Sequence, residues 1–531
     1  MAAPPKGPPL VGPAIQVTPE IDPSRAYNQP QVVVDPKDPL TVAIVGANYN
    51  AGTCGVHVSL DGGRTWRAGK GVAKPADDKT CVRSDSGPYL DGAFANGTIY
   101  LASASDDFGG QQDVNNLYLS RSTDLGDTWE TTIAHKGGTA VEFTEVNGTK
   151  KIGGEHFSLV RMGIDQNNPN YVYVGGRLGH ADRTPPYGLF GNVSLRAVIV
   201  ASEDGGKTWG PMVDLLDGLP RAEYAGSRLP SITVGNDGTV YAFHRERTAP
   251  NDPAKPANAQ SAPGSPGAGG RLFLSTSTDH GKSWTTKSID DSGVPCTACT
   301  ADPEGVYNPK TGELYVVFGQ RDNADAEQNV WIKRSTDGGR TFGPSIRVNH
   351  DATPRDHQYP QVSVAPNGRV DVAWHDWRND TLFNPGGTRS NALYWDVYYS
   401  HSNDGGLTWA DDMRMSDRSM HRNEGYSFHN NYGLGGPVGI ASTDAAALVA
   451  WGDSRRGSVP LPVEDYYFAS AVYDRSALEA SGGGESHTAR DVALGSVITL
   501  VVAGLVLVFA AAAGRRGQPK PAPAPSKAGA T

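Results

Sequence analysis

Arginine and acidic side chains recur at the ends of predicted β-strands in this chain, at the same point of a repeated strand pattern. A guanidinium group holds a carboxylate through two parallel hydrogen bonds, so arginines that converge on one point would form a site for an acidic ligand. Any one of these residues could equally be solvated or paired with a neighbouring charge, but their recurrence favours a shared pocket. The segments concerned are Asp106 and Asp107, 177–183, 244–247, Arg321 and Asp322, 375–378, and 453–456.

The motifs of most other enzyme classes are missing from the sequence. It contains no G-x-S-x-G nucleophile turn, no H-E-x-x-H zinc motif, no phosphate-binding P-loop and no dinucleotide-binding glycine pattern. Cys296 and Cys299 have the C-x-x-C spacing, but neither a second such pair nor a histidine cluster accompanies them, so zinc is not predicted. We therefore expect no metal and no cofactor.

The strands that must hold these side chains are marked by a turn motif, S-x-D-x-G-x-[T/S]-[W/F]. Its aspartate can accept hydrogen bonds from backbone N–H groups, and its glycine supplies the positive φ at which the chain reverses. The final aromatic residue can bury a large area against a neighbouring sheet. Six copies, spaced by 58 to 80 residues, begin at Ser59, Ser122, Ser202, Ser277, Ser335 and Ser402.

A pair of apolar strands joined by a short turn precedes each copy, and a further strand lies on either side of the motif. Four antiparallel strands per repeat are typical of a β-propeller blade, so the fold class is all-β. Strand pairs begin near Pro30, Pro88, Glu155, Arg228, Asp302, Tyr359 and Pro437, which favours seven blades. The seventh repeat lacks the motif, and the segment 13–22 resembles the missing outer strand that would close the ring. Six blades, with one pair as an insertion, is the alternative.

Blade topology decides which face to search for a site. The repeated turns join the third and fourth strands, and the short turns between first and second strands lie on the same face. The longer loops that contain the arginines lie on the opposite face, around the mouth of the central channel. We expect the functional site there.

The repeated turns are similar to the Asp boxes of sialidases and of the wider BNR-repeat propellers, and the resemblance covers roughly residues 13–475. It implies a glycoside hydrolase of exo-sialidase type that acts on extracellular glycans or glycoproteins. Arg228, within Ser227-Arg-Leu-Pro230, resembles the carboxylate-binding arginine of that family. The arginines that would bind substrate are Arg228, Arg245, Arg247, Arg321 and Arg378.

The same resemblance suggests the catalytic residues. Tyr359 occupies a place comparable to that of the family's tyrosine nucleophile, and Glu155 or Asp376 would serve as its base. Asp252 would be the acid. Two features depart from the family pattern: the arginine motif falls in the fourth repeat, and Asp252 lies in a Pro/Ala-rich segment. A non-catalytic surface propeller that binds glycan or protein therefore remains the alternative.

The C-terminal region predicts a membrane anchor. Residues 492–513 form an uncharged apolar run whose helix would rise about 33 Å, enough to cross a hydrocarbon core of about 30 Å. Arg515 and Arg516 follow and favour a cytoplasmic C-terminus. The predicted organisation is a tail (1–12), the propeller (13–475), a flexible linker (476–490), a transmembrane helix (491–514) and a cytoplasmic tail (515–531).

Charge and cysteine content agree with an exported domain. The formal net charge of −10 argues against nucleic acid as a partner, since phosphate binding needs a basic surface. Four cysteines in an exported protein suggest two disulfides. Sequence proximity suggests the pairs Cys54–Cys81 and Cys296–Cys299, with free thiols at the second pair as the alternative.

Overall fold

The computed structural model describes fifteen stretches of the chain, all within one compact unit, Met1–Leu478. They are 7–19, 25–48, 51–72, 90–104, 116–137, 141–144, 150–153, 155–180, 196–217, 226–247, 270–289, 303–321, 327–380, 393–425 and 437–474.

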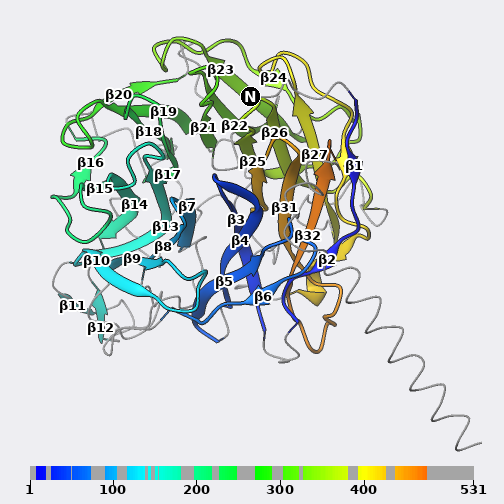
Figure 1. Cartoon of the computed structure of the whole chain (residues 1–531), viewed down its shortest axis with the longest axis horizontal. Coiled ribbons are helices and arrows are strands. Elements are labelled where there is room, and N and C mark those ends of the chain that lie inside the picture. Colours follow the sequence, from blue (N-terminus) through cyan, green and yellow to red (C-terminus); the bar gives the residue numbers. More distant parts are fainter. Residues whose placement is uncertain are drawn as a thin grey trace, which may run out of the picture. The chain divides into compact units, whose positions relative to one another are not determined.

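Seven antiparallel sheets surround a central axis, and each forms one blade (Figure 1). Blade 1 contains β3 (Tyr27–Asp35), β4 (Asp38–Asn48), β5 (Thr53–Ser59) and β6 (Arg67–Ala68), and blade 2 contains β7 (Leu90–Ala95), β8 (Thr98–Ala104), β9 (Leu117–Ser122) and β10 (Glu130–His135). Blade 3 contains β13 (Glu155–Ile164), β14 (Val172–His180), β15 (Arg196–Ser202) and β16 (Val213–Asp214). Blade 4 contains β17 (Gly226–Val234), β18 (Val240–Arg247), β19 (Gly270–Ser277) and β20 (Thr285–Ser288).

The remaining three sheets complete the ring. Blade 5 contains β21 (Glu304–Tyr307), β22 (Leu314–Arg321), β23 (Gln328–Ser335) and β24 (Ile346–Arg347). Blade 6 contains β25 (His357–Val364), β26 (Val370–Asp376), β27 (Tyr394–Ser402), β28 (Met413–Arg414) and β29 (Met420–His421). Blade 7 contains β30 (Gly439–Ser442), β31 (Ala446–Asp453) and β32 (Asp465–Val472), together with β1 (Leu10–Val11) and β2 (Ile15–Gln16) from the N-terminal segment. A separate hairpin joins β11 (Val141–Thr144) to β12 (Lys150–Gly153), and η3 (Arg422–Glu424) follows β29. The prediction of seven blades is confirmed.

The N-terminal strands close the ring by completing blade 7. The strand β2 pairs with β32, the third strand of that blade, as the outer-strand resemblance of 13–22 predicts. The strand β1 also pairs with β32, although it lies in the segment 1–12 that was predicted to be a tail. Thr18 repeats a contact made by the fourth strand of blade 6: its hydroxyl accepts a hydrogen bond from Tyr466 N and donates one to Asp465. Ser416 does the same for Val397 N and Asp396. The first residues of the chain thus take the place of an outer strand.

Each repeated turn is held by the same hydrogen bonds. In the turn that begins at Ser202, the serine hydroxyl donates to Asp204 at 2.8 Å and accepts from Gly206 N. Asp204 also accepts from the backbone and the hydroxyl of Thr208. The middle glycine has a φ of +82°, and a Cβ on Gly206 would lie 2.2 Å from Leu119 of the preceding blade. The motif therefore closes its own turn and also packs against the sheet of the preceding blade.

The first testable prediction concerns the acid stability of these turns. The hydrogen bonds from Thr128 and Ser122 lower the pKa of Asp124 from 3.8 to about 2. Because the folded-state pKa is depressed, the stabilisation is complete above pH 3.8 and is lost as the pH falls through about 2. The difference in thermal midpoint between the wild type and Asp124→Asn should therefore narrow from about pH 5 to about pH 2. A difference that stays constant over this range would contradict the assignment.

The antiparallel registers show which way each strand runs. The serine of a repeated turn lies opposite the start of the second strand, as in Val240 with Ser277 and Val370 with Ser402. Second strands therefore begin at the face that holds the turns, here called the turn face, and end at the opposite face. Arg177, Arg245, Asp376 and Asp453 all lie at or near these far ends.

Two predictions made from the sequence, the disulfide pairing of Cys54 and the transmembrane helix, concern regions that the described residues cover only in part or not at all. Cys54, on β5, is disulfide-bonded, and its partner lies outside the described residues, so the pairing with Cys81 stays a prediction. The transmembrane helix predicted at 491–514 also lies outside them, as do the linker and the C-terminal tail. Within the described residues, no helix has the length and apolar character needed to span a membrane.

Candidate functional site at the channel mouth

Four inner strands carry a β-bulge at the same height on the opposite face. The register shifts lie between Asn28 and Gln31, Ser158 and Arg161, Arg228 and Ser231, and Gln358 and Gln361. A bulge re-aims the side chains beside it and is common near functional sites. This height is therefore where the inner strands can turn side chains toward the channel.

The registers bring two of the predicted arginines together at this height. Arg228 on β17 and Arg245 on β18 are direct partners across the strand pair of blade 4. In blade 3 the equivalent partner of Ser158 is Arg177, which is buried like Arg245. Blades 3 and 4 are neighbours in the ring, since β14 contacts β17. Arginine is therefore concentrated at this height in two neighbouring blades, 3 and 4.

Tyr359 lies at the bulge of blade 6 in an unusual backbone conformation. Its φ is +53°, and Gln29 and Leu159 have the same conformation at the bulges of blades 1 and 3. A non-glycine residue in this region costs about 1–3 kcal/mol and persists only where its surroundings hold it. The Tyr359 ring makes an edge contact with His375, at 5.9 Å between ring centres. Complete burial lowers the pKa of His375 to about 3, so this neighbour is neutral.

A ring of polar side chains lies one step below the bulges. Six inner strands place a polar residue at the same register relative to the repeated turns: Gln31, Asp91, Arg161, Ser231, Glu304 and Gln361. Two of them bind the next inner strand, because Asp91 accepts from Met162 N at 2.9 Å and Ser231 accepts from Gly305 N at 2.8 Å. Burial raises the pKa of Asp91, although the charge of Arg161 opposes this. The ring links neighbouring blades beneath the candidate site.

Asp376 and Arg378, both predicted site residues, bind each other. Arg378 donates from Nε at 3.0 Å and from Nη2 at 2.6 Å to the two carboxylate oxygens of Asp376. Trp374 Nε1 donates to the same carboxylate, and the guanidinium lies 4.0 Å from the ring centre of Tyr398. We call this arrangement the arginine latch of blade 6.

Blade 7 contains the same latch. Arg455 donates to Asp453 at 3.0 and 2.8 Å, Trp451 Nε1 donates to that carboxylate, and the guanidinium lies 3.9 Å from the ring centre of Tyr467. The shared sequence signal is W-x-D-x-R. Because the latch recurs in a blade without predicted catalytic residues, its common role is to hold the end of the second strand.

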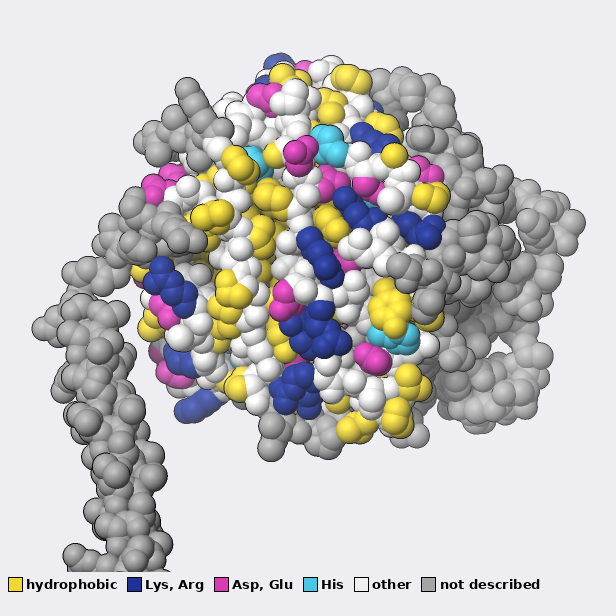
Figure 2. Space-filling model, turned by 90° about the vertical axis from the view of Figure 1, so that its right-hand side faces the viewer, with side chains coloured by type: hydrophobic (Ala, Val, Ile, Leu, Met, Phe, Trp, Pro, Cys, Tyr) yellow, Lys and Arg dark blue, Asp and Glu magenta, His cyan; other side chains and the backbone are white. Residues whose placement is uncertain are grey.

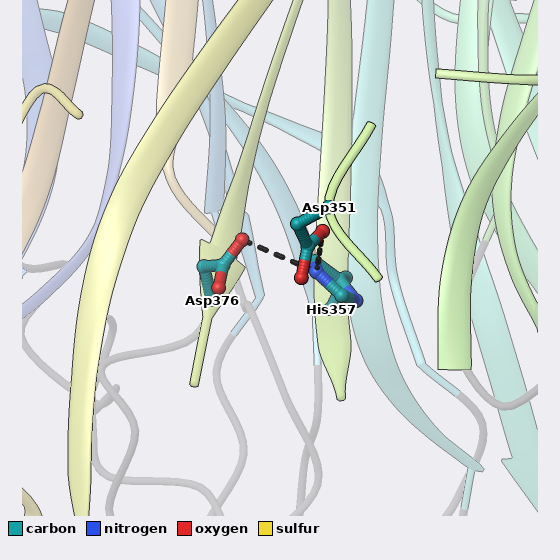
Figure 3. Close-up of side chains that lie close together, drawn as sticks. All are labelled: Asp351, His357 and Asp376. Atoms are coloured by element: carbon teal, nitrogen blue, oxygen red, sulfur yellow. Dashed lines mark hydrogen bonds and ion pairs between the residues drawn. The ribbon is translucent and has the colours of Figure 1, made fainter. Parts of the chain in front are cut away.

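The latch of blade 6 has more ionic partners than that of blade 7, in which Arg455 Nη2 lies 2.7 Å from one further carboxylate, Asp417. His357, at the start of β25, lies with Nε2 2.8 Å from Asp351 and 3.4 Å from Asp376 (Figure 3). Arg378 Nη2 lies 3.2 Å from Asp351 and 2.8 Å from Asp412. We call Asp351, His357, Asp376 and Arg378 the seam cluster, because Asp351 belongs to the connection between blades 5 and 6.

The seam cluster has the ligand types of a metal site, but its cation position is filled. The ligand atoms of Asp351, His357 and Asp376 lie within 4.8 Å of one another, a spacing that could hold a metal ion. Arg378 Nη2 contacts both carboxylates at this point. Positive groups therefore already alternate with the two carboxylates, and the arrangement is that of an ion-pair network.

The other predicted site residues are only partly covered by the described residues. Glu155 begins β13, Arg228 lies within β17, Arg247 ends β18 and Arg321 ends β22, but their side chains lie outside the described part of the structure. Asp252 lies outside it entirely. Their predicted roles stay predictions.

Sequence reasoning missed Asp351, His357 and Asp412 as partners of the predicted site residues. Asp351 lies 27 residues before Arg378 and Asp412 lies 34 after it, and no motif links them. Arg161 was also missed, although its register marks it as part of the polar ring. The repeated W-x-D-x-R would have been a usable signal for the latch.

Comparison with known proteins finds similar structures but no matching family. No family model matches the chain, and no curated protein matches it. Similar solved structures include a Hadza microbial sialidase, at 14% identity over 78% of this chain and 73% of that chain, with a TM-score of 0.40. A protein of unknown function from Dyadobacter fermentans is 13% identical over 87% of this chain and 98% of that chain, with a TM-score of 0.43. Trypanosoma rangeli sialidase in complex with sialic acid is 12% identical over 79% of this chain and 57% of that chain, with a TM-score of 0.44. Likeness at this level concerns the propeller fold alone.

Proposed function

We propose that the chain is a sialidase-like glycoside hydrolase that binds the carboxylate of an acidic sugar at the channel mouth. The observation that carries the proposal is the register of β17 and β18, which makes Arg228 and Arg245 direct partners at the bulge of blade 4. Two guanidinium groups at one height suit a carboxylate, because each offers parallel N–H donors. The bulge at Tyr359 has the same height two blades further on.

In this proposal the tyrosine forms the covalent bond. The Tyr359 oxygen attacks the anomeric carbon, the bond to the leaving-group oxygen breaks, and Asp252 protonates that oxygen. Water then displaces the tyrosine and completes hydrolysis. The base that takes the phenol proton is Glu155 rather than Asp376, because Trp374 and Arg378 already bind the Asp376 carboxylate. Arg321 and Arg247 would bind more distant parts of the substrate, and Arg378 would hold the rim in place.

A non-catalytic propeller that binds glycan or protein is the second candidate. One observation favours it: the described arginines at the ends of strands in blades 6 and 7 are engaged by carboxylates, as Arg378 is by Asp376 and Arg455 by Asp453. Arginines that are paired in this way stabilise the rim and leave less positive charge for a substrate. Both candidates share the channel mouth and differ only in chemistry.

The proposed location is the cell surface, with residues 492–513 crossing the membrane and the C-terminus in the cytoplasm. The disulfide at Cys54 supports an oxidising compartment for the propeller. We also propose that nucleic acid is not a partner. On the side of the propeller shown in Figure 2, Lys and Arg side chains form a strip that has Asp and Glu side chains among them. A mixed surface of this kind lacks the uniform positive charge that phosphate backbones require.

The deciding experiment measures turnover by the full chain on a panel of aryl glycosides that includes a sialoside. We expect release of the aryl group from the sialoside, and its loss in Tyr359→Phe, which lacks only the nucleophilic oxygen. Tyr118→Phe, in the body of blade 2, is the matched control for loss of one phenol. Absence of turnover on every substrate by a folded protein that still binds the sialoside would support the binding role instead.

A further inference from the structure

We propose that the seam cluster is a protonation-dependent latch that holds the connection between blades 5 and 6 and, through it, the start of β25. Its parts come from three places in the fold: Asp351 from the connection 348–356, His357 from the first position of β25, and Asp376 from the end of β26 (Figure 3). When His357 carries a proton, one imidazolium binds both carboxylates. When it is neutral, Arg378 is the one described positive group that still contacts both carboxylates, and the remaining donors, such as Trp374 to Asp376 and Asn349 to Asp351, are uncharged.

The contacts of His357 define what its proton does. Nδ1 lies 2.8 Å from the carbonyl oxygen of Gln328 on β23, and this contact requires a proton on Nδ1. Nε2 lies 2.8 Å from Asp351 Oδ1, so a second proton at Nε2 completes that hydrogen bond. A neutral ring that keeps its Nδ1 proton would turn a lone pair toward the Asp351 carboxylate. The geometry itself thus favours the charged ring.

The charges around His357 act in the same direction. Its side chain is fully buried, and the charged groups that face it are Asp351, Asp376 and Arg378, with Asp412 and His350 one contact further away. Burial alone would lower the pKa of His357, but the hydrogen bond to Asp351 and the two carboxylate charges outweigh it, so the pKa is raised. Stabilisation by the latch is therefore complete below the ordinary histidine pKa and is lost as the pH rises through the raised value.

The latch lies next to a strained residue that the proposed function uses. Only Gln358 separates Tyr359 from His357 in the chain, and Tyr359 has a φ of +53°. A strained conformation persists only while its neighbours are held. Among the residues just before Tyr359, His357 is the one whose side chain is fully buried and bound on both ring nitrogens. If Tyr359 is the nucleophile, which rests on the proposed function, the latch makes His357 a positioning residue for it. The latch itself does not depend on catalysis.

Hydrogen–deuterium exchange of the full chain tests the latch directly. Between about pH 6 and about pH 10, after correction for intrinsic rates, protection of 348–361 should fall about tenfold for each unit by which the pKa of His357 is raised. In His357→Gln the protection of this segment should not depend on pH in this way. In Asp351→Asn, which removes one charge but keeps the shape, the fall should begin at lower pH. The control is the segment 451–456, which contains the arginine latch of blade 7, formed by Asp453 and Arg455. Its protection should show no such fall.

Three results would overturn the latch: constant protection of 348–361 in the wild type over this range, the same pH dependence in His357→Gln, or an equal fall in 451–456. A midpoint that does not move in Asp351→Asn would also count against it, because a purely structural role for the pair predicts no shift. Failure of the glycoside assay would refute only the proposed function, since the exchange measurement requires no turnover. Where turnover is found, kcat should decline over the pH range in which protection is lost.

Discussion

An Arg25→Met substitution is expected to lower the free energy of unfolding by about 3–5 kcal/mol, because it leaves a buried carboxylate without its partner. Asp465 is fully buried, and Arg25 Nε donates to it at 2.7 Å. Among the described residues, Thr18 is the other side chain that donates to Asp465, at 3.1 Å. Arg456 lies 3.8 Å from Asp465, which is too far for a hydrogen bond. The pair joins the segment after the closing strands to β32, so its loss should weaken the propeller where its first and last strands meet.

The measurement is urea or thermal unfolding of the wild type, Arg25→Met, Asp465→Asn and the double variant. If the two groups stabilise each other, the double variant should be less destabilised than the sum of the single variants. Arg67→Met is the matched control, because Arg67 forms an exposed ion pair with Asp127 and should cost at most about 1 kcal/mol. Equal losses for Arg25→Met and Arg67→Met would refute the closure role of Arg25.

An Arg228→Ala or Arg245→Ala substitution is expected to weaken recognition of an acidic sugar by about 2–5 kcal/mol, or roughly 30-fold to 4,000-fold in kcat/KM or Kd. The physical reason is the loss of a two-pronged donor to a carboxylate, which a lysine replaces poorly. Arg245→Lys should therefore retain only part of the affinity. The readout is the ratio of kcat/KM, or of affinity, for an acidic ligand to that for its neutral analogue. Damage to the fold would lower the value for both ligands and leave the ratio unchanged.

Arg64→Ala provides the control for that experiment. Arg64 is exposed in the first repeated turn, on the turn face, and its loss should leave both ligands unaffected. A specific loss for the acidic ligand in Arg228→Ala and Arg245→Ala, with none in Arg64→Ala, supports the channel mouth as the site. Equal weakening for the acidic ligand and its neutral analogue would place the carboxylate elsewhere.

The architecture could be predicted because its signals are local. Each repeated turn makes its hydrogen bonds within seven residues, as Ser202 does with Asp204 and Gly206, so one short pattern suffices to identify it. The closing strand could also be found, because Ile15, Val17 and Thr18 repeat the pattern of Met413, Met415 and Ser416. Counting these strands led to seven blades, and the pairing of β2 with β32 confirms the closure.

The candidate site was less accessible to sequence reasoning because its contacts are distant. Arg378 was recognised as a strand-end arginine, but its partner Asp412 follows the next repeated turn and Asp351 precedes the strand pair. Nothing in the order of residues distinguishes an arginine that binds substrate from one that is paired with a carboxylate of the protein, as Arg378 is with Asp376. The same applies to Arg245, whose position opposite Arg228 depends on a bulge that shifts the register by one residue.

The repeated blade, the face that holds the turns and the way the ring closes all follow from the order of residues, because hydrogen bonds within a turn and alternation along a strand are properties of neighbouring residues. Which charges meet depends on how the strands come together in three dimensions. His357 lies against Asp351 and Asp376, and Arg378 lies over Tyr398, because strand pairing within blade 6 and the connection before that blade bring together side chains that the chain order separates. The energy of a buried charge depends on these partners, and so does its function.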